Sequence, residues 1–116
     1  MLTLTIAKPI VAAEYPQRPL RILTPFSAGS TTDIVARPLA VKLSEAWGQP
    51  VVVDNRAGAG GSIAAEIVAK ATPDGHTLLI GATGPNAVNP SLIKNLAYDS
   101  QRAFAPITLT STNNLL

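Results

Sequence analysis

Residues 20–54, LRILTPFSAGSTTDIVARPLAVKLSEAWGQPVVVD, decide the fold, because they read as strand, helix and strand in succession. The run Leu20–Thr24 is apolar and lies between prolines, which predicts a short strand. The capping box Ser30-Thr31-Thr32-Asp33 follows. In it the Ser30 side chain should accept the backbone N–H of Asp33, and the Asp33 carboxylate should accept that of Ser30. The helix that starts there should end at Gly48, which tolerates a left-handed stop.

The rest of the chain continues the same alternation. Residues 51–53 are continuously apolar, which predicts a strand buried on both faces of a parallel sheet. An alanine-rich helix over 63–71, strands over 76–80 and 107–110, and a short helical piece near 90–96 are expected after it. The connections are too long for hairpins, so they predict right-handed crossovers. We therefore expect an α/β fold with helices on both faces of a parallel sheet.

Composition narrows the classes of function. The chain has 116 residues, 47% of them hydrophobic and 14% charged, which is enough apolar surface for a folded core. It has no cysteine, which excludes disulfide scaffolds, thiolate zinc sites and cysteine nucleophiles. The net charge is only +2 and no two basic residues are adjacent, which argues against nucleic-acid binding. The single histidine, His76, is expected at the surface or edge, at the amino end of its strand, so we expect neither an enzyme nor a metal or cofactor site.

Residues 1–13 differ from the rest of the chain. Lys8-Pro9 interrupts their apolar stretch, and the small residues Val11-Ala12-Ala13 suit a signal peptidase. We interpret them as the remnant of an export signal, with an ordinary chain terminus as the alternative. No later stretch approaches the roughly 18 apolar residues of a membrane span, so we expect a soluble chain without direct membrane insertion.

Three loops, over residues 26–33, 55–62 and 81–86, are expected at the carboxyl ends of the strands, where open parallel sheets bind ligands. All are rich in Gly, Ser, Thr and Asn, and the first two lead into helix N-termini. Unpaired backbone N–H groups and the positive end of the helix dipole attract an anion there without Arg or Lys. This pattern favours a small carboxylate or phosphate ligand. Asp33 is either a capping residue alone or also a polar contact of that ligand.

The glycines of the second loop leave another hypothesis open. Gly58-Ala59-Gly60 follows a strand and precedes a helix, as in a dinucleotide-binding fingerprint, but Ile63 stands where the fingerprint needs Gly or Ala. The glycines could instead serve a tight turn and close helix packing. A nucleotide-binding Rossmann-like enzyme module is therefore the alternative function, and a gene fragment without function is a third hypothesis.

Blocks of residues spread over almost the whole chain form one further pattern. They are YPxxPxRI at 15–22, PFSAGxTTDIxAR at 25–37, LSE at 43–45, GQPVVV at 48–53, NR at 55–56, GAGG at 58–61, PDGxTLL at 73–79, NPSL at 89–92, YD at 98–99 and FAP at 104–106. In order and spacing they resemble the Bug-type solute receptors, the extracytoplasmic substrate-binding proteins of tripartite tricarboxylate transporters. Each block alone is weak, but their combination is specific.

The resemblance implies a two-lobed fold of the type II periplasmic-binding-protein class that closes over a small carboxylate. Residues 14–116 would form the N-terminal part of its first lobe, so that the lobe is incomplete and the chain truncated. The resemblance also implies a periplasmic location, membrane subunits of the transporter as partners, and no cofactor. The ligand-binding positions that it implies are Ser27, Gly29, Ser30, Thr32 and Asp33 in the first loop and Thr83, Gly84 and Asn86 in the third.

Overall fold

A computed structural model describes residues 14–112, so the expected signal remnant at 1–13 lies outside the described residues. The structure contains a sheet of three strands, β1 (Leu20–Thr24), β2 (Val51–Asn55) and β3 (Thr77–Leu79), in the order β2-β1-β3. Both pairings are parallel, and Ile22 of β1 lies opposite Val53 on one side and Leu78 on the other. The predicted α/β class and parallel sheet are confirmed.

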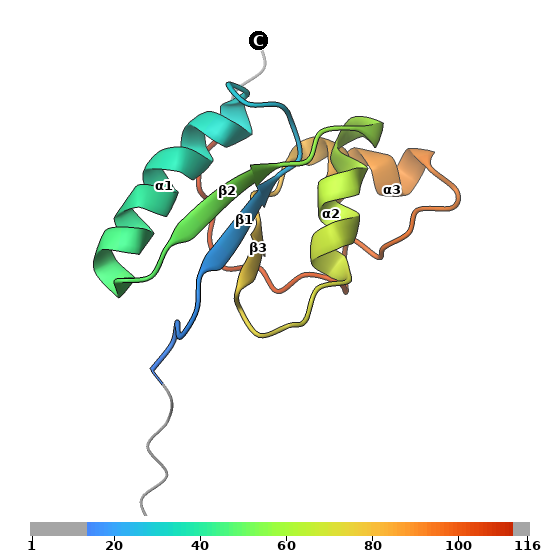
Figure 1. The fold of residues 1–116 in the computed structure, drawn as a ribbon. Helices are drawn as coiled ribbons and strands as arrows, with labels where there is room; N and C mark the ends of the chain where they lie inside the picture. Colours follow the sequence, from blue (N-terminus) through green and yellow to red (C-terminus); the bar gives the residue numbers. More distant parts are fainter. Residues whose placement is uncertain (1–13, 113–116) are drawn as a thin grey trace, which may run out of the picture.

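Helices α1 (Thr31–Trp47) and α2 (Ser62–Ala69) cover opposite faces of this sheet (Figure 1). The crossovers from β1 to β2 and from β2 to β3 run in opposite directions across the sheet, so right-handed connections place their helices on opposite faces. A 3-10 turn, η1 (Ala59–Gly61), precedes α2, and a π-helical turn, η2 (Gly84–Val88), leads into the short helix α3 (Asn89–Leu92). None of the helices within residues 14–112 combines the length and the apolar character needed to cross a bilayer.

The core lies between α1 and the sheet. Ile22 at the centre of β1 packs with Ala36 and Ala40 of α1 and with Ile80. In the sequence, Val35, Leu39, Leu43, Ala46 and Trp47 recur at helical spacing, which predicts that they form the buried stripe of α1. Leu39 and Leu43 pack at the border of this core, whereas Ala46 and Trp47 are exposed. The alanine side of α1 faces inward because small side chains let the helix approach the sheet closely.

β2 is an edge strand, so the prediction that it is buried on both faces is wrong. Val52 is 54% exposed, whereas its neighbours Val51 and Val53 pack against the core beneath α1. The opposite helix, α2, contacts β1 and β3 and leaves this face of β2 uncovered. A run of valines therefore predicted the strand correctly but not its place in the sheet.

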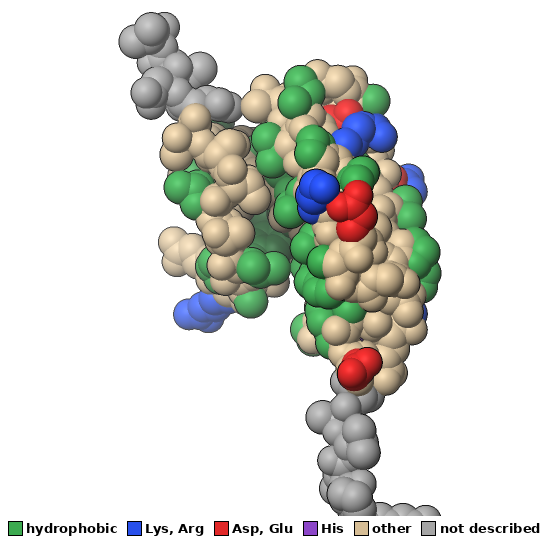
Figure 2. All heavy atoms as spheres, turned by 90° about the vertical axis from the view of Figure 1, so that its left-hand side faces the viewer, with side chains coloured by type: hydrophobic (Ala, Val, Ile, Leu, Met, Phe, Trp, Pro, Cys, Tyr) green, Lys and Arg blue, Asp and Glu red, His purple; other side chains and the backbone are tan. Residues whose placement is uncertain are grey.

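Residues 107–110 do not form the predicted last strand. They are extended, but Ile107 and Leu109 are each 77% exposed, and no ladder partner pairs with this segment within residues 14–112. A strand exists only through hydrogen bonds to a neighbour, so the β-branched, alternating sequence is not sufficient. Figure 2 shows the segment that leads to the C-terminus standing apart from the main body, with hydrophobic side chains in the hollow between them.

Candidate ligand-binding site

The carboxyl ends of the three strands lie at one edge of the sheet and place the three predicted loops there. Because β1 and β3 are neighbours, the segments that follow them emerge side by side. In the strand order β2-β1-β3, the chain first continues to one side of β1, into β2, and then returns to the other side, into β3. The order of the strands therefore reverses at the β1/β3 junction. Open α/β sheets bind ligands at such a switch point.

Gly61 is the residue at which the three segments touch. Its φ is 91°, and a Cβ at this position would lie 3.0 Å from Cβ of Pro25 and 3.1 Å from the ring of Pro85. Both prolines are fully buried. This glycine of the second loop is thus wedged between the segments that follow β1 and β3. Protein atoms fill the space beside Gly61. The glycine therefore serves close packing, and no room is left there for a pyrophosphate to approach.

The first loop is a tight turn that leads into α1. The backbone N–H of Ser30 donates to the carbonyl oxygen of Ser27 at 3.1 Å, and Gly29 has the positive φ, 82°, that favours glycine at the third position of a turn. Ser30 is the N-cap of α1, and its hydroxyl accepts the backbone N–H of Asp33 at 3.4 Å. Ser27 and Gly29 are exposed, whereas Ser30 and Thr32 are half-buried, with their hydroxyls 3.1 Å apart.

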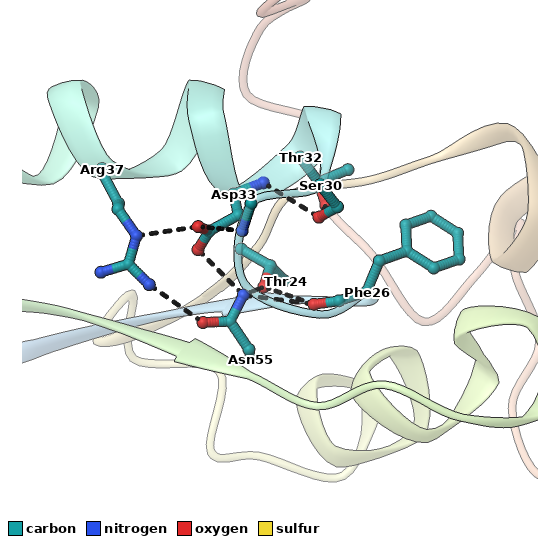
Figure 3. A network of polar contacts seen from close by, with 8 residues as sticks. Thr24, Phe26, Ser30, Thr32, Asp33, Arg37 and Asn55 are labelled. Carbon is teal, nitrogen blue, oxygen red and sulfur yellow. Dashed lines mark hydrogen bonds and ion pairs between the residues drawn. The ribbon is translucent and has the colours of Figure 1, made fainter.

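Asp33 is buried, and its carboxylate is hydrogen-bonded within the protein (Figure 3). Oδ2 accepts the backbone N–H of Gly29 at 2.9 Å and Nε of Arg37 at 2.8 Å, and Oδ1 accepts Nδ2 of Asn55 at 2.9 Å. The predicted bond from the Ser30 amide is wrong, because that amide donates to Ser27 and the carboxylate takes Gly29 instead. The hydrogen bond from Arg37 is the main cause that holds the pKa of Asp33 well below its usual range, and the bonds from Gly29 and Asn55 add to it.

Arg37 also determines what charge an incoming anion meets at the start of α1. A carboxylate in the first turn occupies the positive end of the helix dipole, and the Arg37 guanidinium balances that charge. Within residues 14–112, the backbone N–H groups of Thr31 and Thr32 have no acceptor. The first turn of α1 therefore still offers donors to an anion, beside the hydroxyl of the Ser30 cap.

The Asp33 contacts predict a loss of stability in acid. Because its pKa is lower in the folded chain than in the unfolded chain, Asp33 contributes fully to the free energy of unfolding above the unfolded pKa, about 3.9, and that contribution is lost as the pH falls through the folded pKa. We expect the thermal midpoint, followed by circular dichroism, to stay level from about pH 7 to pH 5 and to fall below about pH 4. Asp33→Asn should be less stable at neutral pH and should lose less on acidification. Parallel curves for the two proteins would contradict this prediction.

The third predicted loop is largely helical. Thr83 already has helical backbone angles, and Gly84 and Asn86 lie within η2. Thr83 and Asn86 are exposed, and Gly84 lies so close to the second loop that a Cβ would be 3.0 Å from the carbonyl oxygen of Gly60. No hydrogen bond within residues 14–112 joins these positions to the predicted binding residues of the first loop.

Sequence reasoning missed four polar residues that tie these segments together. Arg37 and Asn55 hold the first loop, Asn89 donates to Gly60 O at 3.0 Å, and the hydroxyl of Tyr98 donates to Pro85 O at 2.6 Å. A signal exists for Arg37, which stands four residues after Asp33 on the same helix. Asn55 is an amide directly at the end of a strand, which also hints at a role. No local signal identifies the other two, because their partners lie far away in the sequence.

His76 lies directly before β3, at the end of the sheet opposite the loops, as predicted. Its side chain is only 11% exposed, because the ring of Tyr15 packs edge-on against it with ring centroids 5.1 Å apart. Of the two predicted places for this histidine, the edge of the sheet is therefore confirmed and an exposed surface position is wrong. Trp47 packs edge-on against the same tyrosine. Within residues 14–112, no group of three His, Asp or Glu side chains could hold a metal ion.

Comparison with known proteins identifies the family of this chain. The family model described as the tripartite tricarboxylate transporter family receptor matches residues 35–115. The chain belongs to this receptor family. The resemblance predicted from its motifs is thereby confirmed. The chain is 44% identical to protein BugT of Bordetella pertussis, and the match covers 92% of this chain and 33% of BugT.

Solved proteins of related sequence share this arrangement of strands and helices over the part that matches this chain. MatC from Rhodopseudomonas palustris, solved with bound malate, is 40% identical with a TM-score of 0.77 over 83% of this chain and 33% of that one. The periplasmic binding protein BugD is 45% identical with a TM-score of 0.74 over 80% of this chain and 31% of that one. The chain spans about a third of the length of these matched proteins.

Proposed function

We propose that residues 14–116 are the N-terminal part of the first lobe of an extracytoplasmic receptor, which binds a small organic carboxylate and delivers it to a tripartite tricarboxylate-type transporter. The observation that carries the proposal is that the first loop, residues 26–33, and the third, residues 81–86, meet at the β1/β3 junction beside the N-terminus of α1. Backbone N–H groups and hydroxyls at such a place bind an anion without charged side chains. Two related proteins from R. palustris were solved with small dicarboxylates, malate in one and adipate in the other.

The proposed contacts come from the first and the third loop. The first loop supplies hydroxyl and backbone N–H donors, and the third loop supplies a hydroxyl, a backbone N–H and a side-chain amide. The carboxylate of Asp33 acts in this site through the turn, because it fixes the N–H of Gly29 and is itself balanced by Arg37. The proposed ligand-binding residues are Ser27, Gly29, Ser30, Thr32, Thr83, Gly84 and Asn86, together with Asp33, which contributes through the turn that it holds.

The receptor role implies a periplasmic protein whose partners are the membrane subunits of the transporter. The family model describes a receptor, and BugD is described as a periplasmic binding protein, which supports both parts of this proposal. No enzymatic step is proposed for the site.

A chimera tests the proposed site. Residues 14–112 would replace the matching segment of MatC, and isothermal titration calorimetry would measure malate binding. We expect binding in the micromolar range, and we expect Thr83→Ala to weaken it roughly 10-fold, because a hydrogen bond to a charged group contributes about 1.5 kcal/mol or more. Thr72→Ala, which changes an exposed threonine before β3 at the opposite end of the sheet, should leave the Kd unchanged.

Three outcomes would contradict the proposal. Equal effects of the two substitutions would show that the hydroxyl of Thr83 does not contact the ligand. Binding of NAD in place of dicarboxylates would favour the nucleotide-binding alternative. The 116-residue chain alone should bind malate with a Kd above about 1 mM, because a ligand held from one side gains too few contacts to offset the cost of association. Micromolar binding to that chain would contradict the need for a second lobe.

A further inference from the structure

The side chain of Asn55 lies at the centre of the polar contacts that shape the first loop (Figure 3). Its Nδ2 lies within hydrogen-bond distance of Thr24 Oγ1 at 2.6 Å, Asp33 Oδ1 at 2.9 Å and Phe26 O at 3.2 Å, and its two protons are shared among these three acceptors. These acceptors belong to the end of β1, to the first turn of α1 and to the loop between them. A single amide at the end of β2 therefore holds the segment that leads from β1 to α1 at three points.

Arg37 fixes the direction in which this amide faces. Its Nη2 donates to Oδ1 of Asn55 at 3.3 Å, so the amide oxygen faces the guanidinium and the amide nitrogen faces the three acceptors. In the reverse orientation, the amide oxygen would face the carboxylate of Asp33 and the carbonyl oxygen of Phe26 without a proton between them. The position of Nδ2 therefore requires a hydrogen-bond donor.

We infer that Asn55 is a positioning residue of the proposed binding site. Its Nδ2 fixes the Asp33 carboxylate and the Phe26 carbonyl, and the fixed carboxylate in turn holds the N–H of Gly29 and the turn that presents Ser30. Asn55 thus acts on the ligand through the loop and needs no contact with it. The inference rests on the proposed function for its ligand, but the positioning itself is a property of the ligand-free chain.

Asn89 makes the same kind of contact elsewhere and provides a matched control. Its Nδ2 lies within hydrogen-bond distance of Ala59 O at 3.3 Å, Gly60 O at 3.0 Å and Ser62 Oγ at 2.7 Å, so it joins α3 to the second loop. Each asparagine satisfies acceptors that lie far away in the sequence. Removal of either side chain should therefore destabilise the whole chain, but each should loosen a different loop.

Amide hydrogen exchange, measured by NMR on the 116-residue chain, separates the two effects. Asn55→Asp keeps the shape of the side chain but replaces the donor by an acceptor. We expect the Gly29 amide to exchange roughly 10-fold faster in this variant than in the wild type. The amide of Arg21, which donates to His76 O in the sheet, reports any change in global stability, and the Gly29 rate is corrected for that change. Asn89→Ala should leave Gly29 unchanged and accelerate the amide of Gly61, which donates to Gly58 O.

Two results would overturn the inference. One is an exchange rate for Gly29 that changes in proportion to that of Arg21, and the other is a wild-type rate for Gly29 in Asn55→Asp. If the Asn55→Asp variant does not fold, Asn55→Ala provides a second test, because it removes the donor without placing a second carboxylate beside Asp33. The Gly29 amide should accelerate there as well, and an unchanged rate would contradict the inference.

The malate-binding chimera distinguishes this inference from the proposed function. In it, Asn55→Asp should raise the Kd for malate roughly 10-fold, whereas Thr72→Ala should not change it. Malate binding that is unaffected by Asn55→Asp would overturn the positioning role alone. A chimera that fails to bind malate, with a Gly29 amide that responds as expected in the free chain, would overturn the proposed function and leave the positioning role intact.

Discussion

Replacement of Gly61 by alanine should lower the free energy of unfolding by about 2–4 kcal/mol. The φ of 91° at this position costs a residue with a side chain about 1–2 kcal/mol. The new Cβ would also lie 3.0 Å from Cβ of Pro25 and 3.1 Å from the ring of Pro85, and buried proline rings cannot rotate away from it. Urea denaturation followed by circular dichroism measures the loss.

Gly48 provides the matched control for this substitution. Its φ is 63°, but a Cβ there would meet nothing within 4 Å. Gly48→Ala should therefore cost only the backbone term, about 1 kcal/mol. Equal losses in the two variants would show that the segments after β1 and β3 do not press on Gly61. Because Gly61 separates these segments, Gly61→Ala should also weaken malate binding in the chimera.

The second large effect is expected at the centre of the sheet. Ile22 is 1% exposed and packs with Ala36, Ala40 and Ile80. Ile22→Ala should cost about 3–4 kcal/mol, because the alanines of α1 are too small to fill the cavity that it leaves. Such a loss is a large fraction of the total stability of a small domain, so the variant should unfold at a much lower urea concentration.

Val52 tests whether burial, and not strand position, causes this loss. It lies on the neighbouring strand β2, but its side chain is 54% exposed. Val52→Ala should cost less than about 1 kcal/mol, and Ile22→Val should cost about 0.5–1.5 kcal/mol. Similar losses for Val52→Ala and Ile22→Ala would contradict the described packing.

Signals that depend on neighbouring residues predicted their elements correctly. The proline-flanked run Leu20–Thr24 is a strand, the Ser30 cap starts α1, and Gly48 ends it with a left-handed conformation. Each of these depends on backbone geometry over a few residues, which side-chain chemistry controls directly. The parallel sheet was also predictable, because connections of this length permit little else.

Signals that depend on distant partners failed in their detail. The valines of β2 indicated a doubly buried strand, but their burial depends on which strand lies at the edge of the sheet. Residues 107–110 have a strand-like pattern without a partner to pair with in the described chain. The segment from Thr83 onward is rich in turn residues, and yet it forms the helical turn η2, which packs on the second loop.

By itself, the sequence determined the family, the β-α-β-α-β order that builds the sheet, and the two segments that carry the proposed site, because motifs, caps and periodicity are local properties. Only the tertiary structure decided that Asp33 is held by Gly29, Arg37 and Asn55, and that Gly61 fills the point where the segments meet. The physical reason is that hydrogen bonds and close packing act over a few ångströms. The partners of Asp33 and Gly61 come within that distance only after the strands have paired and the helices have packed on the sheet.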